Sequence, residues 1–250
     1  MKIYWYRNSK NLIGHRLHDL RISQHLTQRQ LAARMQLAGM EMNEVTILRI
    51  EKGVRFVPDY EVAELAKALG DEETYRTFND RGYWWRNVIS DEGYCHMRDS
   101  KGQWLENFDP FRSGANQHYV EGNAWQLTFF VPQDVPALVE KIGKQRFTDR
   151  LLWGFNQDEA WRYNAPNDQY WDHPVVQGNQ QSMHFAFLFN YADTPWNTQR
   201  WSRSILDRYY GYGIANAYLG DEDQGQMSAW AIMTSIGLFQ TDGGCRVDPV

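Results

Sequence analysis

Residues 220–230 read Gly-Asp-Glu-Asp-Gln-Gly-Gln-Met-Ser-Ala-Trp, a run that puts three carboxylates directly before an apolar stretch. The apolar stretch continues to Ile236 and stops at Gly237, as is typical of a helix ended by glycine. Acidic groups before a helix N-terminus are favoured in their ionised form. One of the three is therefore suited to act as a general base, although such residues are more often helix caps.

The rest of residues 71–250 alternates helical stretches with long aromatic loops in the same way. Few segments alternate polar and apolar residues at period two, so strands are not expected. Asp134 is placed to cap one helix, with proline tolerated just inside it. The expected helices are 80–88, 134–142, 198–209 and 226–236. This pattern predicts a mainly α layout of helical hairpins with functional loops between them.

Two further loops carry side chains suited to sugar chemistry. In the first, Glu121 stands close to Trp125, whose apolar ring would raise the carboxyl pKa and keep the group protonated as a general acid. The second loop, 178–184, offers side-chain amides and the imidazole of His184, which suit sugar hydroxyls or a hard cation. One protonated and one ionised carboxyl are the minimum for breaking a glycosidic bond. Each of these residues also has a structural interpretation: Glu121 as part of a surface turn, and the Trp125 indole and the His184 imidazole as parts of the core.

Residues 12–70 show a different pattern, that of a small helical bundle. Thr27, with Gln30 three residues later, forms a capping-box sequence before an apolar stripe. Asn43 is placed to cap the following helix, and Gly53 to close it. The expected helices in this part are 12–22, 27–35, 44–52 and 60–69.

The residues Leu26-Thr27-Gln28-x-x-Leu31-Ala32 and Ile47-x-x-Ile50-Glu51-x-Gly53 resemble the Cro/phage-repressor type of helix-turn-helix. The resemblance implies that helix 43–52 enters the major groove of DNA. The residues that it places at DNA are Gln28, Asn43, Glu44, Thr46, Arg49 and Arg55. The carboxylate at position 44 and the apolar side chains at 45 and 48 depart from such families and weigh against strong binding. A bundle that serves packing or dimerisation is the open alternative.

The balance of charged residues also changes at about residue 70. Residues 1–70 carry 11 Lys and Arg against 7 Asp and Glu, whereas residues 71–250 carry 15 against 24. A mildly basic first part is compatible with an anion such as DNA, and the acidic remainder is not. We therefore expect two domains with these bounds. No run of about 18 apolar residues occurs, which excludes a membrane span, and the two cysteines, Cys95 and Cys245, favour reduced thiols in a cytoplasmic protein.

A second resemblance rests on many ordered matches between about residues 62 and 243. They include Glu121-Gly122-Asn123-Ala124-Trp125-Gln126, Pro195-Trp196-x-Thr198-Gln199 and Gly220-Asp221-Glu222-Asp223-x-Gly225-Gln226-Met227-Ser228-Ala229-Trp230. These segments resemble the C-terminal part of glycoside hydrolase family 92, the calcium-dependent exo-α-mannosidases. The resemblance implies a partial (α/α)6 barrel and inverting hydrolysis of terminal α-mannosides.

By motif, the resemblance makes Glu121 the general acid and Asp223, assisted by Asp221, the base. An inverting pair lies about 6.5–9.5 Å apart, which leaves room for the attacking water. The implied substrate contacts are Trp125, His184 and Gln226. The implied ligands of Ca2+, or alternative sugar contacts, are Asn179 and Gln180. The family usually reads Gly-Asn-Glu-Pro where this chain reads Gly-Asn-Gln-Gln, and a neutral amide in place of a carboxylate should weaken a Ca2+ site.

Two functions remain open at this point. The first is a glycoside hydrolase module of α-mannosidase type. Members of that family are several times longer. A missing half of the barrel, or a second copy in a homodimer, would then complete the pocket. If such a part is required, we expect the module alone to be inactive. The second is a DNA-binding regulator whose C-terminal part senses a sugar or dimerises.

Overall fold

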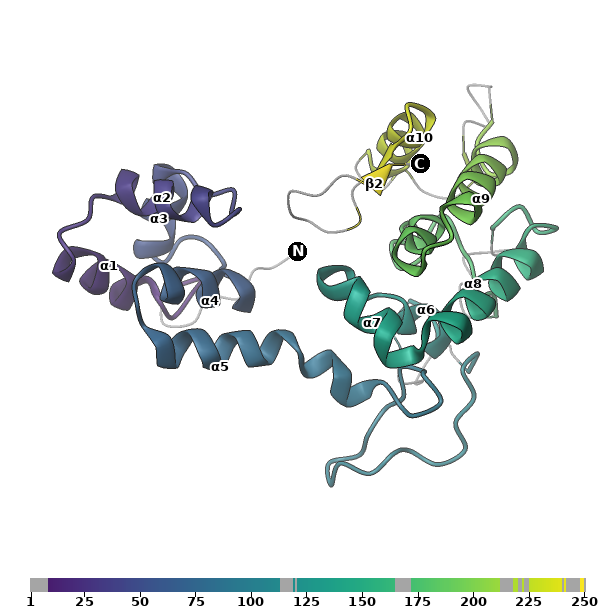
Figure 1. Ribbon diagram of the computed structural model, residues 1–250, viewed down its shortest axis with the longest axis horizontal. Coiled ribbons are helices and arrows are strands. Elements are labelled where there is room, and N and C mark those ends of the chain that lie inside the picture. The colour runs from purple at the N-terminus through teal and green to yellow at the C-terminus, as the bar shows by residue number, and fades with distance from the viewer. Residues whose placement is uncertain are drawn as a thin grey trace. The chain divides into compact units, whose positions relative to one another are not determined.

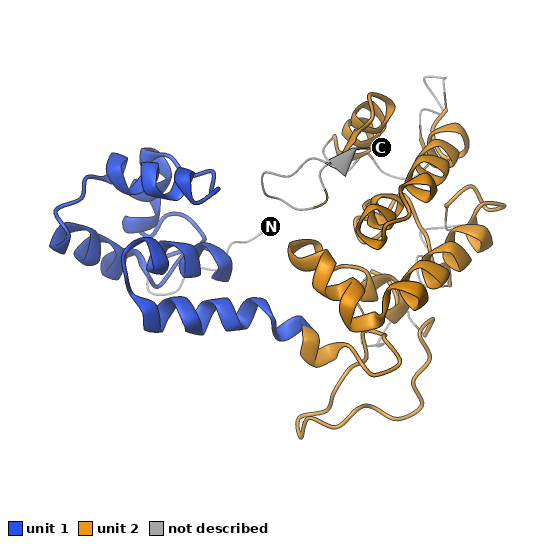
Figure 2. Cartoon of the chain, viewed as in Figure 1, with its two compact units in different colours: residues 1–85 blue, residues 86–250 orange. Residues whose placement is uncertain are grey.

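The computed structural model describes residues 9–112, 119, 121–164, 172–211, 218–219, 222, 225–239, 241 and 248–249. Contacts within the chain divide it into unit 1, Met1–Trp85, and unit 2, Arg86–Val250 (Figure 2). Both units are mainly helical, which confirms the predicted fold class. The sequence division was expected at residue 70, whereas helix α5 (Glu72–Gly82) lies by its contacts in unit 1.

Unit 1 is a bundle of short helices, drawn in purple and blue in Figure 1. They are α1 (Gly14–Ser23), α2 (Gln28–Leu37), α3 (Glu44–Glu51), α4 (Asp59–Ala68) and α5, and the 3-10 helix η1 (Trp84–Val88) follows. Side-chain caps start two of them: Thr27 and Gln30 form the expected capping box, and Asn43 Oδ1 accepts from the Thr46 N–H at 2.9 Å. α3 packs on α1 and α2, and α4 packs on α2 and α5.

The core of unit 1 is apolar with one buried ion pair. Its members include Leu17, Leu31, Met35, Met42, Ile47, Ile50, Leu65 and Leu69. Arg21 Nε lies 2.6 Å from Glu51 Oε1, and the two side chains are only 7% and 5% exposed. Arg21 is on α1 and Glu51 is on α3, so the pair ties these helices together inside the bundle.

Unit 2 packs its helices around a short central one. Its elements are α6 (Ala124–Thr128), the 3-10 helix η2 (Pro132–Asp134), α7 (Val135–Ile142), α8 (Lys144–Asp158), the 3-10 helix η4 (Phe185–Ala192), α9 (Pro195–Arg208), α10 (Gln226–Ser235) and the two paired strands β1 (Leu238–Phe239) and β2 (Asp248–Pro249). Six of the eight side chains of η4 are buried. A helix that is apolar around its whole circumference must be covered on all sides. α7, α8 and α9 all contact η4 and provide that cover (Figure 1).

Most predicted helices are present, and two local expectations are wrong. The helix expected over 80–88 is instead the end of α5 followed by η1, because Asp71 caps α5 well before that stretch, with its Oδ1 3.2 Å from the Thr74 N–H. Asp134 occupies the position before α7 but its side chain makes no capping hydrogen bond. It lies 3.6 Å from Arg86 instead. The longest helix, α8, was not anticipated.

Two further sequence expectations concern membranes and thiols. No helix in the described part of the chain is long and apolar enough to cross a membrane. Cys95 is a free thiol, and burial raises its pKa to about 11. Cys245 lies outside the described residues.

Candidate functional site

Glu121 lies on a turn that leads directly into α6. Its side chain is exposed, and its backbone is left-handed, with φ of 54°. A non-glycine residue in this region is strained and persists only where its surroundings fix it. The carbonyl oxygen of Glu121 accepts from Asn179 Nδ2 at 2.5 Å, and Asn123 Oδ1 caps α6 by accepting from the Gln126 N–H at 2.9 Å. The carboxyl group therefore projects from a turn that is held on both sides.

The loop 178–184 contacts the turn of Glu121 on one side and the segment before α10 on the other. Asn179 is 3% exposed and makes the bond to Glu121. A Cβ on Gly178 would lie 2.6 Å from Tyr209 Oη and 3.6 Å from the carbonyl oxygen of Leu219. Only glycine allows this approach, because contacts under about 3 Å are not tolerated. The loop thus joins parts of the chain that are far apart in sequence.

Of the three acidic residues before α10, the structure describes Glu222. Its Oε1 accepts from the Ser228 N–H at 3.1 Å, which is the capping role expected of an acid at a helix N-terminus. A hydrogen bond from Tyr218 is the main cause that holds the pKa of Glu222 below its usual value. Gln226 is the first residue of α10 and is half-buried. The predicted bases Asp221 and Asp223 lie outside the described residues.

Trp125 and His184 are both core residues in the structure. The Trp125 indole is fully buried and packs against the rings of Phe129, Trp153 and Phe185 at centroid distances of 4.8, 6.3 and 5.8 Å. The indole is therefore part of the core, and Glu121 is exposed rather than enclosed with it. His184 Nε2 lies 2.8 Å from the Phe129 carbonyl oxygen, and burial lowers the pKa of His184 to about 4. These positions agree with the structural interpretation of the two residues.

Two polar residues near Glu121 were not found by sequence reasoning. Asp158, at the end of α8, is 1% exposed, and its Oδ1 lies 2.7 Å from His173 Nδ1. The His173 carbonyl oxygen accepts from Gln126 Nε2 at 2.7 Å, next to the turn of Glu121. The helical spacing of Phe147, Leu151 and Phe155 predicts helix α8. No local sequence pattern predicts that its last residue, Asp158, bonds to His173.

The described residues do not by themselves fit a calcium site. Ca2+ takes about six to eight oxygen ligands, usually including carboxylates. Asn179, whose Nδ2 donates to the Glu121 carbonyl oxygen, and the exposed Gln180 would supply neutral amide oxygens and no carboxylate. In the part of the chain that the structure describes, no group of three or more His, Cys, Asp or Glu side chains is arranged to hold a metal.

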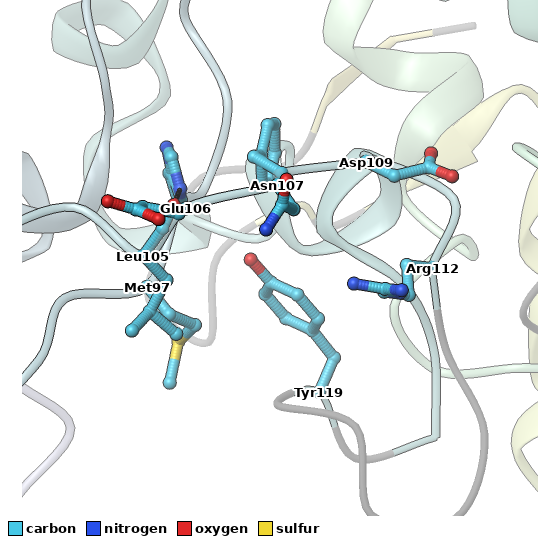
Figure 3. A pocket seen from close by; sticks show the side chains of 9 residues that line it. Met97, Leu105, Glu106, Asn107, Asp109, Arg112 and Tyr119 are labelled. Carbon is cyan, nitrogen blue, oxygen red and sulfur yellow. Dashed lines mark hydrogen bonds between the residues drawn. The ribbon is translucent and has the colours of Figure 1, made fainter.

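Three cavities lie near the candidate residues, and the most open, of about 640 Å³, is lined in part by Trp125, Arg150 and Trp153. The smallest, of about 40 Å³, is lined by residues 96–97, 105–109, Arg112 and Tyr119 (Figure 3). At roughly 10–15 Å³ per water it holds a few water molecules and no sugar ring. Another, of about 330 Å³, lies between α9 and α10 and is lined in part by Tyr210, Tyr218 and Ser228. The last two are the partners of Glu222, so this space adjoins the acidic segment.

Most of the residues predicted to face DNA in unit 1 serve the bundle itself. Gln28 Nε2 donates to Glu51 at 2.8 Å, and Arg55 Nη2 donates to Glu61 at 2.8 Å. Asn43 and Thr46 are bonded to each other at the start of α3. The two remaining candidates, Glu44 and Arg49, are exposed side chains of opposite charge. This arrangement gives no specific support to a DNA interface.

Comparisons with known proteins identify a family. The model of the glycosyl hydrolase family 92 catalytic domain matches residues 55–247. A solved family GH92 alpha-mannosidase from Bacteroides thetaiotaomicron is similar with 37% identity and a TM-score of 0.60, over 73% of this chain and 24% of that one. A family GH92 inverting mannosidase from the same organism gives 27% identity and a TM-score of 0.59, over 73% and 26%.

A third relative comes from the curated proteins. It is an uncharacterized secreted glycosidase of Arthroderma benhamiae, 24% identical over 208 residues, which are 74% of this chain and 25% of the relative. The chain thus spans about a quarter of the length of each of these relatives.

Proposed function

Because the chain belongs to glycosyl hydrolase family 92, we propose that it acts on a terminal α-mannoside and hydrolyses it with inversion at the anomeric carbon. Residues 55–247 are an α-mannosidase-like glycoside hydrolase domain. A solved family GH92 alpha-mannosidase that resembles it with 35% identity and a TM-score of 0.61 is a complex with mannoimidazole. The proposed substrate class follows from these relatives.

In the proposed reaction, Glu121 donates a proton to the leaving oxygen while the bond from that oxygen to the anomeric carbon breaks. Asp223, assisted by Asp221, removes a proton from the water that attacks the opposite face of the sugar. Such acid and base pairs work when they stand far enough apart to admit the water, about 6.5–9.5 Å. Gln226, half-buried at the start of α10, is the proposed contact to a sugar hydroxyl.

The observation that supports the proposal is that loop 178–184 lies against both the turn of Glu121 and Leu219, next to the acidic segment. Asn179 bonds to the carbonyl of Glu121, and Gly178 lies against Leu219, three residues before Glu222. Burial raises the pKa of Tyr210 strongly, and the negative charge of Glu222 raises it further. Tyr210, which follows α9, is therefore close to Glu222. An acid-bearing turn and an acid-bearing helix start are therefore neighbours of one loop. A cavity of about 330 Å³ beside Glu222 gives space of the size that small-ligand sites have.

The test is release of mannose from 4-nitrophenyl α-mannoside and from an α-linked mannobiose. We expect activity from the wild-type chain and its loss, by roughly 100-fold or more, in Glu121→Gln on the mannobiose and in Asp223→Asn on both substrates. Proton NMR of the first product should show the β-anomer, because inversion is proposed. Glu140→Gln, an exposed acid on α7, is the matched control and should leave the rates unchanged.

Identical traces from the wild type and both variants, or an α-anomer as first product, would contradict the assignment. Calcium enters the proposal only as a family expectation, tested by calorimetric titration of Ca2+ into the wild type and into Asn179→Ala. Equal heats from the two proteins would remove Asn179 as a ligand.

A further inference from the structure

Asp158 is a buried carboxyl group outside the proposed chemistry. It is 1% exposed, and both of its oxygens are used: Oδ1 with His173 Nδ1 at 2.7 Å and Oδ2 with the Val175 N–H at 2.6 Å. A buried carboxyl group is costly unless its partners are fixed by hydrogen bonds. These two bonds therefore determine the path of the backbone over residues 173–175.

That stretch of backbone in turn holds the turn that carries Glu121. The His173 carbonyl oxygen accepts from Gln126 Nε2 at 2.7 Å and from Asn123 Nδ2 at 3.3 Å. Both donors belong to the first turn of α6, and Asn123 is also its N-cap. Glu121 precedes this turn by two residues and has a left-handed backbone that needs support from its surroundings. The bonds thus run from α8 through residue 173 to the turn of Glu121.

We propose that Asp158 and His173 are positioning residues for Glu121: they fix the turn so that its carboxyl group meets the glycosidic oxygen. This inference rests on the proposed function. Proton transfer requires an approach of about 2.6–3.2 Å, and a displacement of about 1 Å can cost roughly 100-fold in rate. Removing the Asp158 carboxyl group should therefore impair protonation of the leaving group much more than it impairs binding.

The experiment compares two substrates that share the mannosyl group and whose leaving groups differ in their need for an acid. An α-linked mannobiose has a leaving group that must be protonated, whereas 2,4-dinitrophenyl α-mannoside has one that leaves unaided. We expect Asp158→Ala to lower kcat on the mannobiose by roughly 100-fold at nearly unchanged KM, and to lower kcat on the activated substrate less than about threefold. The matched control is Asp149→Ala, which removes an exposed carboxyl from the same helix and should change neither rate.

A merely structural role predicts equal losses on the two substrates, and that result would overturn the inference, as would no loss on either. If Asp158→Ala melts below the assay temperature, Asp158→Asn, which keeps an acceptor for the Val175 N–H, is judged by the same comparison. A wild-type chain that turns over neither substrate would defeat the proposed function instead. The inference is then decided by amide hydrogen exchange: faster exchange over residues 124–128 in the Asp158 variant supports it, and unchanged exchange overturns it.

Discussion

At the scale of single residues, His184 shows how burial fixes a protonation state. The imidazole is surrounded by the rings of Phe130 and Phe185, with centroids 5.5 and 5.1 Å away. Its Nε2 has one partner, the Phe129 carbonyl oxygen at 2.8 Å, which a neutral ring with hydrogen on Nε2 satisfies. Burial lowers the pKa of His184 from 6.5 to about 4 because a charged ring cannot be solvated there.

This residue should make the stability of unit 2 sensitive to mild acid. In the unfolded chain His184 takes up a proton near pH 6.5, whereas in the folded chain it does so only near pH 4. The stabilising effect is therefore complete above pH 6.5 and is lost as the pH falls toward 4, by about 3 kcal/mol at most. Urea unfolding followed by tryptophan fluorescence at several pH values measures this.

His184→Gln, whose side-chain amide can donate to the Phe129 carbonyl, should flatten that pH dependence. His15→Gln, a change at an exposed histidine of α1, is the control and should leave it in place. Equal slopes for His184→Gln and the wild type would contradict the assignment to this imidazole.

Local chemistry explains which residues sequence reasoning placed correctly. The capping box of Thr27 with Gln30 and the cap at Asn43 connect residues three apart, so the pattern and the bond lie in the same short stretch. The pair Asp158 and His173 is separated by 15 residues and by a change of direction, and no local pattern joins them. The same limit applied to Trp125, whose neighbours in the core come from α8 and η4 as well as from α6.

At the scale of secondary structure, α8 shows where local propensity fails. No side chain caps its start, because Gly143 occupies that position with φ of 90°. Gly154 lies inside the helix, where glycine is unfavourable by about 1 kcal/mol relative to alanine. Packing explains the glycine: a Cβ there would lie 2.5 Å from two carbons of the Trp125 ring. Tertiary contact, and not helix propensity, therefore selects glycine at position 154, although the spacing of Phe147, Leu151 and Phe155 indicates the helix itself.

Gly154→Ala should therefore destabilise unit 2 although alanine favours helix. Trp125 is fully buried and has little room to move, so we expect a loss of about 1–3 kcal/mol in the free energy of unfolding. Urea unfolding followed by tryptophan fluorescence measures it. Gly82→Ala, at the end of α5 with nothing within 4 Å of the added carbon, should be neutral or slightly stabilising. A Gly154→Ala protein as stable as the Gly82 variant would show that the ring yields to the methyl group.

At the scale of the whole molecule, the chain contains two cores of different chemistry. The core of unit 1 is largely aliphatic and includes the ion pair of Arg21 and Glu51. The core of unit 2 is aromatic, with Phe155 stacked on Trp201 at 5.1 Å among many ring contacts. Composition accounts for this contrast, because the first 70 residues hold 5 of the 37 aromatic residues. The family match begins at residue 55, however, so α4 belongs to the hydrolase pattern while it packs in the core of unit 1.

Since each core closes within its own unit, a defect in one should be felt mainly there. Glu51→Ala leaves the Arg21 guanidinium buried without its carboxylate, which costs about 3–5 kcal/mol when one partner of a buried pair is removed. Hydrogen exchange at increasing urea, read by mass spectrometry, should show protection lost over residues 14–68 at lower urea, with residues 124–208 unchanged.

Glu72→Ala breaks the exposed pair with Arg76 and should cost less than about 1 kcal/mol. Equal loss of protection in both units for Glu51→Ala would mean that the chain unfolds as one cooperative body, and that α4 couples the hydrolase fold to the bundle before it.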